Sequence, residues 1–189
     1  MSVASPDSGQ SSDVFAVVLT GPPGVGKTAV LTALSDALSD DGIAHAAIEV
    51  EALVSAHPPL SDAQVMRHVR STCDIYREAG HTLLLVAHTL ETDEDVLRLL
   101  DAIGADEHLL VRLEAEPATL VERIVEREPS SWSGLAALIA HTQTLCRTMP
   151  ALRAVDLVIS TEDERAEDVA ARIQDARPEP LTSTSVPRR

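Results

Sequence analysis

Short apolar runs alternate with longer amphipathic segments along most of the chain. The short runs are rich in Leu, Val, Ile and Ala and carry few charges, which is typical of strands buried in a parallel sheet. They predict five strands, at residues 14–19, 43–50, 82–88, 107–113 and 155–160. The longer segments predict helices, at residues 29–40, 61–79, 92–104, 117–128, 134–149 and 162–176. Because strands and helices alternate, the expected fold is α/β: a three-layer α/β/α sandwich around a five-stranded parallel sheet.

The two ends of the chain lack this alternation. Residues 1–12 are mostly small and polar, and residues 177–189 are rich in Pro, Ser and Thr. Such segments bury too little apolar surface to offset the entropy lost on ordering. We therefore predict two disordered tails around one domain at residues 13–176. The apolar content of the whole chain, 44%, is sufficient for one hydrophobic core.

The turn after the first predicted strand carries the clearest chemical signal. Residues 21–28 read Gly-Pro-Pro-Gly-Val-Gly-Lys-Thr, the pattern G-x-x-x-x-G-K-T of the phosphate-binding loop, or Walker A. Its glycines let backbone N–H groups approach phosphates, and the following helix adds its positive N-terminal end. We expect Lys27, the only lysine among 15 basic residues, to reach the β- and γ-phosphates, and the Thr28 hydroxyl to bind Mg²⁺. The predicted nucleotide-binding residues here are Gly21, Pro22, Pro23, Gly24, Val25, Gly26, Lys27, Thr28 and Ala29.

Composition excludes several other classes of partner. A formal net charge of −15 argues against a nucleic acid or an anionic membrane surface, because no basic stripe is present to bind phosphates. The apolar runs are too short for a transmembrane helix, and the first residues do not resemble a signal peptide, so we expect a cytoplasmic protein. The histidines and the two cysteines lack metal-ligand spacing, and we expect no structural zinc.

Two large classes of nucleotide-binding protein lack their required parts here. The AAA+ ATPases need an acidic pair at the end of an apolar strand, but the strand at residues 82–88 is followed by Thr89 and Leu90. Regulatory GTPases read guanine with an Asn-Lys-x-Asp loop, which cannot exist when Lys27 is the only lysine. The sequence disfavours both classes.

Residues 113–127, Leu-Glu-Ala-Glu-Pro-Ala-Thr-Leu-Val-Glu-Arg-Ile-Val-Glu-Arg, resemble the lid entry of the nucleoside-monophosphate-kinase-like enzymes. That group of P-loop NTPase fold includes adenylate, shikimate and gluconate kinases and chloramphenicol phosphotransferase, and the layout also resembles uncharacterised bacterial ATP-binding proteins. Arg123 and Arg127 are four residues apart and share a helix face, where an anion would relieve their repulsion. The resemblance implies that Arg123 lies against adenine, that Arg127 stabilises the transferred phosphoryl group, and that residues 128–134 form a short lid. The alternative is a solvated arginine pair matched by neighbouring glutamates.

The end of the second predicted strand carries two carboxylates. This region resembles the end of the second strand in related small-molecule kinases, which carries an Asp-x-Asp pair. This chain has Glu49-Val50-Glu51 there. Alternation along a strand would place Glu49 and Glu51 on one face. We expect one carboxylate, Glu49, to bind Mg²⁺ through water, and the other, Glu51, to accept the proton of an attacking hydroxyl. The alternative is an acidic strand end without a catalytic role.

The acceptor of such a kinase would lie between the second strand and the helix that follows it. Arg67 and Arg70 are close on the helix at residues 61–79 and would hold an anionic acceptor, and His88 ends the third strand. Surface salt bridges would explain the two arginines equally well.

The function expected from these features is an ATP- and Mg²⁺-dependent phosphotransferase that acts on the hydroxyl or phosphate of a small molecule, with Lys27, Glu49, Glu51 and Arg127 in the catalytic roles. The alternative is a regulatory P-loop NTPase that hydrolyses its nucleotide slowly and signals through a protein partner. ADP release that depends on an acceptor would separate the two hypotheses.

Overall fold

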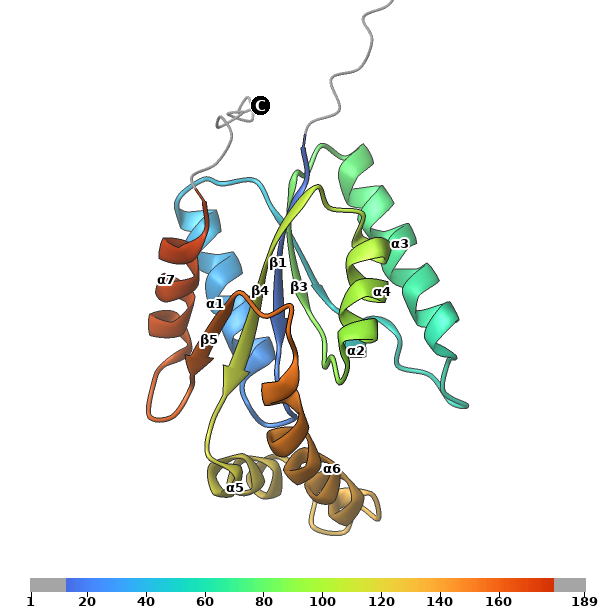
Figure 1. The fold of residues 1–189 in the computed structure, drawn as a ribbon, viewed down its shortest axis with the longest axis vertical. Coiled ribbons are helices and arrows are strands. Elements are labelled where there is room, and N and C mark those ends of the chain that lie inside the picture. The colour runs from blue at the N-terminus through green and yellow to red at the C-terminus, as the bar shows by residue number, and fades with distance from the viewer. Residues whose placement is uncertain (1–12, 179–189) are drawn as a thin grey trace, which may run out of the picture.

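The computed structural model describes residues 13–178 and contains one five-stranded sheet between helices (Figure 1). All pairings between neighbouring strands are parallel, and the order is β2-β3-β1-β4-β5. The strands are β1 (Phe15–Thr20), β2 (Ala46–Glu49), β3 (Leu83–Ala87), β4 (Glu107–Glu114) and β5 (Leu157–Ser160). The α/β fold predicted from the sequence is confirmed, and β1 lies at the centre of its sheet.

The helices form a layer on each face of the sheet and a third group beyond its carboxyl edge (Figure 1). α1 and α7 cover one face, α3 and α4 cover the other, and α5 and α6 lie beyond the ends of the strands. Their bounds are α1 (Lys27–Asp40), α2 (Val50–Leu53), α3 (Asp62–Glu78), α4 (Asp93–Ile103), α5 (Pro117–Arg127), α6 (Leu135–Thr148) and α7 (Ala166–Ala176), with a 3₁₀ turn η1 (Met149–Ala151) after α6.

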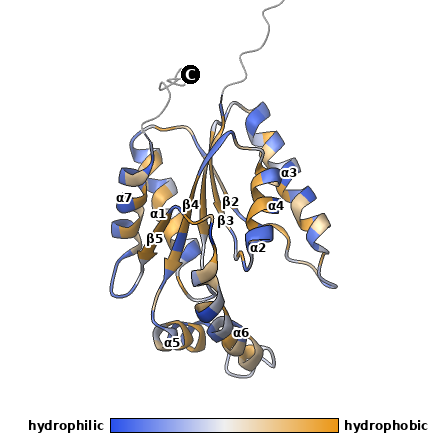
Figure 2. Ribbon diagram, in the orientation of Figure 1, coloured by the Kyte–Doolittle hydropathy of each residue, from blue (hydrophilic) through white to orange (hydrophobic). Residues whose placement is uncertain are grey.

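Two apolar cores fill the space between these layers, and Figure 2 shows the central strands as the most hydrophobic part of the fold. Val17 and Leu19 of β1 pack in the core with α1 and α7, whereas Ala16 and Val18 pack in the core with α3 and α4. Every residue of β3 is buried. Strands buried on both faces explain why the sequence shows continuous apolar runs and not a polar alternation.

Several helix ends follow directly from local sequence. Ser61 and Gln64 form a capping box at the start of α3, and Thr92 and Asp95 form one at the start of α4. α4 ends at Gly104, whose φ of 62° is the left-handed conformation that glycine adopts at low cost. These ends agree with the sequence prediction to within one residue.

The second strand is shorter than predicted, and this changes the geometry of its carboxylates. β2 pairs only with β3, and its last pair joins Glu49 to Ala87, where β3 also ends. Val50 then turns into the core and begins α2, with Val54 N–H bonded to its carbonyl. The prediction that Glu49 and Glu51 share one face of a strand is therefore wrong, because Glu51 belongs to a helix.

The closing helix and the two ends of the chain were also predicted from the sequence. The closing helix begins at Ala166 and not at residue 162, because the Glu162 side chain bonds to the Glu116 N–H and the Asp163 backbone has a φ of 54°. The predicted tail at residues 1–12 and most of the tail at 177–189 lie outside the described residues. Among the helices of residues 13–178, none has the length and apolar character needed to cross a bilayer.

Candidate functional site

The loop at residues 21–28 connects β1 to α1 at the carboxyl edge of the sheet. A Cβ atom at Gly21 would lie 2.5 Å from the Leu113 carbonyl oxygen, and one at Gly24 would lie 2.9 Å from the Leu120 carbonyl oxygen. Gly24 also has a φ of 84°, in the left-handed region. The loop is thus packed directly against the end of β4 and against α5, which is possible only for residues without a side chain.

Lys27 is the first residue of α1, and its ammonium group lies over the loop. Its Nζ donates hydrogen bonds to the carbonyl oxygens of Gly21, at 3.0 Å, and Pro22, at 3.5 Å. Burial lowers the pKa of Lys27, while the carboxylates of Glu51 and Glu49 act in the opposite direction. A desolvated cation is therefore held at the mouth of the loop with both glutamates within electrostatic reach.

Thr28 and Glu49 meet beside this cation. The Thr28 hydroxyl donates a hydrogen bond of 2.5 Å to Glu49 Oε1, which connects the start of α1 to the end of β2. A hydroxyl and a carboxylate are the hard oxygen ligands that Mg²⁺ prefers, and Mg²⁺ commonly takes only one or two protein ligands beside substrate phosphates and water. Within residues 13–178 no group of three or more His, Cys, Asp or Glu side chains could hold a metal alone. The pair fits a magnesium ion shared with a nucleotide.

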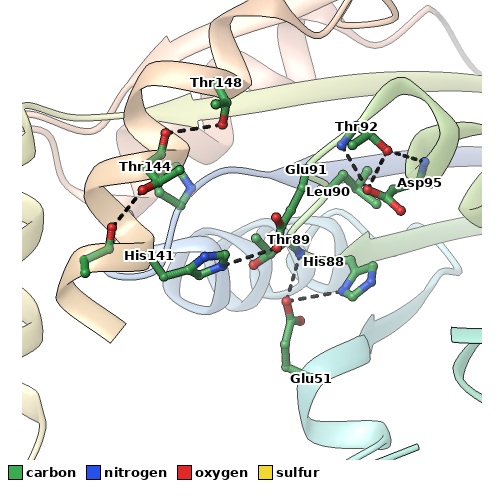
Figure 3. Close-up of polar contacts among 12 residues, drawn as sticks. Glu51, His88, Thr89, Leu90, Glu91, Thr92, Asp95, His141, Thr144 and Thr148 are labelled. Atoms are coloured by element: carbon green, nitrogen blue, oxygen red, sulfur yellow. Dashed lines mark hydrogen bonds and ion pairs between the residues drawn. The ribbon is translucent and has the colours of Figure 1, made fainter. Parts of the chain in front are cut away.

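Glu51, on α2, acts electrostatically on Lys27 and lies beside His88 and Thr89 (Figure 3). Its Oε1 accepts the Thr89 N–H at 2.8 Å and lies 3.3 Å from Nδ1 of His88. Burial alone would raise the pKa of Glu51, but the hydrogen bond and charge of His88, the Lys27 ammonium and the Thr89 N–H together lower it to about 2. The carboxylate is ionised and fixed in orientation at neutral pH.

The two arginines of α5 have different environments. Arg123 donates to the hydroxyl and the carbonyl of Thr161, at 3.2 Å and 2.9 Å, and the Thr161 hydroxyl donates to the Val25 carbonyl at 3.0 Å. Arg127 bonds to Glu128 at 2.8 Å, and its side chain is 59% exposed. The positive charge of Arg127 lowers the pKa of Lys27, so the two cations are within electrostatic reach of each other.

The predicted acceptor residues are only partly brought to this site. His88 is part of it, through Glu51. Arg70 forms an ion pair of 2.7 Å with Asp101 of α4. Arg67 is exposed and lies two residues, about 200° around the helix, from the fully buried Val69. The structure does not bring Arg67 and Arg70 together with Lys27.

The sequence patterns did not single out two contributors to the site. Thr161 follows β5, where its hydroxyl donates to the Val25 carbonyl, and Thr20 ends β1, where its hydroxyl accepts the Leu90 N–H at 3.0 Å. Each lies at the carboxyl end of a predicted strand, and ligands in open α/β sheets bind outside those ends. Their position at strand ends could therefore have identified them as site residues. The contact of Glu91 with His141 of α6, at 3.2 Å, has no such sequence signal (Figure 3).

A pocket of about 280 Å³ opens beside the glycine loop, and Lys27 does not line it. It lies at the ends of β4 and β5, and Pro22 is its only lining residue from the loop. Arg112, on its wall, donates to the Met149 carbonyl at 2.9 Å and to Glu114 at 3.1 Å. Arg112 therefore has protein partners on this wall, and the pocket does not include Lys27, Thr28, Glu49 or Glu51.

Comparison with known proteins identifies the fold. No family model matches the chain, and no curated protein matches it. A sugar kinase from Janibacter sp. HTCC2649 has a TM-score of 0.62 at 18% identity, over 87% of this chain and 94% of that one. An APS kinase from Mycobacterium tuberculosis, solved with AMPPNP and APS, has a TM-score of 0.59 at 17% identity, over 86% and 96%. A gluconokinase from Sinorhizobium meliloti 1021 has a TM-score of 0.55 at 18% identity, over 85% and 94%. The chain has the fold of the P-loop small-molecule kinases, as the sequence resemblance implied.

Proposed function

We propose that this protein transfers the γ-phosphoryl group of ATP to a small-molecule acceptor in a reaction that requires Mg²⁺. One observation carries the proposal: Lys27, the Thr28–Glu49 pair and Glu51 converge at the glycine loop, although they come from three separate elements. The solved structures with this fold include a sugar kinase and an APS kinase bound to an ATP analogue.

The donor half of the site would be built from the loop and α5. Backbone N–H groups of residues 21–29 would surround the phosphates, and the Lys27 ammonium would exchange its bonds to the loop carbonyls for bonds to phosphate oxygens. That exchange is favourable because an ammonium pairs more strongly with an anion than with a neutral carbonyl. Arg123, fixed by Thr161, would lie against the adenine ring.

Thr28 and Glu49 would hold Mg²⁺, Thr28 directly and Glu49 through water. When bound, the ion would neutralise charge on the β- and γ-phosphates. Their mutual hydrogen bond already holds the two side chains together, so neither would need to move far to hold the ion. Their separate origins, α1 and β2, explain why neither residue alone identifies the site.

The transfer itself would depend on charge and on exclusion of water. Lys27 and Arg127 would stabilise the negative charge of the transferred group, and the loop at residues 128–134 would close over it as a lid. Arg127 donates a hydrogen bond to Glu128 of that loop, so closure of the lid would move the Arg127 side chain as well. Glu51 would accept a hydrogen bond from the attacking group and receive its proton late in the reaction.

ADP release tests the proposal. With ATP, Mg²⁺ and a metabolite panel, we expect turnover that disappears in Lys27→Ala and when EDTA removes the metal. Arg172→Ala is the matched control, since it deletes an exposed cation paired with Glu164 on the surface. Turnover that survives Lys27→Ala would refute the mechanism. Tight nucleotide binding with slow hydrolysis that no acceptor changes would instead favour a regulatory NTPase.

A further inference from the structure

Two arginines of α3 that could bind an anionic acceptor are bonded to residues outside the site. Arg70 of α3 bonds to Asp101 at 2.7 Å, and Arg77 bonds to Asp74 at 2.7 Å and to the Ile103 carbonyl. These contacts hold both guanidinium groups in the interface between α3 and α4. Arg67 lies on the far side of α3 from the buried Val69. Among residues 13–178, no arginine of α3 bonds to a residue of the site.

Two carboxylates, Glu51 and Glu91, lie just beyond the ends of β2 and β3, and each contacts a histidine. Glu51 lies beside His88 and Thr89, and the next residues of that loop bring Glu91 against His141 of α6 (Figure 3). Glu51 has both of these contacts on Oε1. Within residues 13–178 no group bonds to the other oxygen, Oε2, so it can accept a hydrogen bond from a ligand in a fixed direction.

A phosphate or carboxylate placed here would be repelled by an ionised Glu51, and the guanidinium groups of Arg70 and Arg77 are already bonded to other residues. A hydroxyl, in contrast, donates a good hydrogen bond to a carboxylate, and a nearby ammonium would be attracted to Glu51. Lys27 and Arg127 cannot take the role of acceptor anchors, since the proposed function uses both on the transferred phosphoryl group.

We propose that the acceptor is an alcohol without phosphate or carboxylate groups, either an uncharged polyol or an amino alcohol, and that its reacting hydroxyl binds Glu51 Oε2. This inference rests on the proposed function. In the reaction the hydroxyl oxygen bonds to the γ-phosphorus while the bond to the β–γ bridging oxygen breaks. The electron pair of that bond leaves with ADP, and the hydroxyl proton passes to Glu51. His88 and Thr89 are positioning residues, because they act by holding Oε1.

The test is a matched acceptor panel in three charge classes, with transfer detected as a new phosphate-ester signal by ³¹P NMR. The uncharged class contains glucose, glycerol and myo-inositol, the cationic class glucosamine, ethanolamine and choline, and the anionic class gluconate, shikimate and glycerol 3-phosphate. We expect transfer to members of the first two classes alone. Transfer to members of the anionic class would overturn the inference.

Variants separate this inference from the proposed function. Glu51→Gln should lower kcat for the active acceptor by about 10²-fold or more and change the affinity for ATP far less. Glu167→Gln, an exposed carboxylate of α7, is the matched control. His88→Gln should lower kcat less and change its pH profile, a readout that a purely structural role would not move. Arg67→Ala should leave KM for the acceptor unchanged, and a tenfold rise would contradict us. If no member of any acceptor class receives a phosphoryl group, the proposed function has failed; if transfer occurs but reaches anionic acceptors, only this inference has failed.

Discussion

The packing of the glycine loop against α5 makes a quantitative prediction for Gly24→Ala, with Gly26→Ala as the matched control. Both glycines have left-handed backbones, with φ of 84° and 95°, and an alanine there costs roughly 1–2 kcal/mol of stability. The difference lies in the space around the new Cβ. At Gly26 nothing lies within 4 Å, whereas at Gly24 the Leu120 carbonyl oxygen is at 2.9 Å and Ile124 Cγ1 is at 3.1 Å.

The Leu120 carbonyl is helix backbone and cannot rotate away as a flexible side chain would. Overpacking of this kind costs about 1–3 kcal/mol, so we expect a total loss of about 2–5 kcal/mol for Gly24→Ala. Gly26→Ala should lose only the strain common to both variants, about 1–2 kcal/mol. A difference of about 2 kcal/mol corresponds to about 1 M in the urea midpoint, for a slope of about 2 kcal/mol per M.

Urea unfolding followed by circular dichroism measures this difference directly. We expect the midpoint of Gly24→Ala to fall clearly below that of Gly26→Ala, with similar slopes. Equal midpoints would show that the loop does not pack against α5 as described, and a lower midpoint for Gly26→Ala would refute the reasoning outright. Because α5 also carries Arg123 and Arg127, the same clash should displace both arginines from the loop.

Three further predictions follow from the structure. Thr92→Ala removes the cap of α4 and should cost about 0.5–2 kcal/mol in urea unfolding, where a loss near zero would contradict the capping box. Trp132, the only tryptophan, lies against Gly134, so Gly134→Ala should displace its ring and shift its emission, and an unchanged spectrum would disprove that contact. The pKa of Glu51 lies near 2, below its ordinary 4.5, so its stabilising effect is complete above pH 4.5 and is lost as pH falls toward 2. The stability difference between wild type and Glu51→Gln should shrink over that range, and a constant difference would contradict the assignment.

The sequence predicted the parts of this protein that depend on local pattern. Five apolar runs gave the five strands, and the loop at residues 21–28 was recognised because its glycines and lysine are contiguous. The position of Glu51 in a helix could not be predicted from local pattern in the same way. Its place in α2 depends on where β3 ends, since an edge strand loses its partner there. Strand alternation through Glu51 would need β2 to run two residues beyond its end at Glu49, although the charge of Glu51 still acts on Lys27 from α2.

Long-range contacts explain the remaining misses. Arg70 was a reasonable acceptor ligand from its spacing, but the position of Asp101 on α4 decides its direction. Thr161 bonds to Val25, 136 residues earlier, and to Arg123, and neither contact has a local sequence signature. Residue type and strand ends can suggest such partners, but the packing of helices selects among them.

The central claim is that the loop at residues 21–28 is the donor site of a phosphotransferase. A crystal structure with AMPPNP and Mg²⁺ tests it most directly. We predict that the β- and γ-phosphates lie within the loop, that Lys27 Nζ leaves the carbonyls of Gly21 and Pro22 for phosphate oxygens, and that the metal lies beside Thr28 and Glu49. The adenine should contact Arg123. A nucleotide bound elsewhere, or Lys27 still bonded to the loop carbonyls beside bound phosphates, would contradict the account.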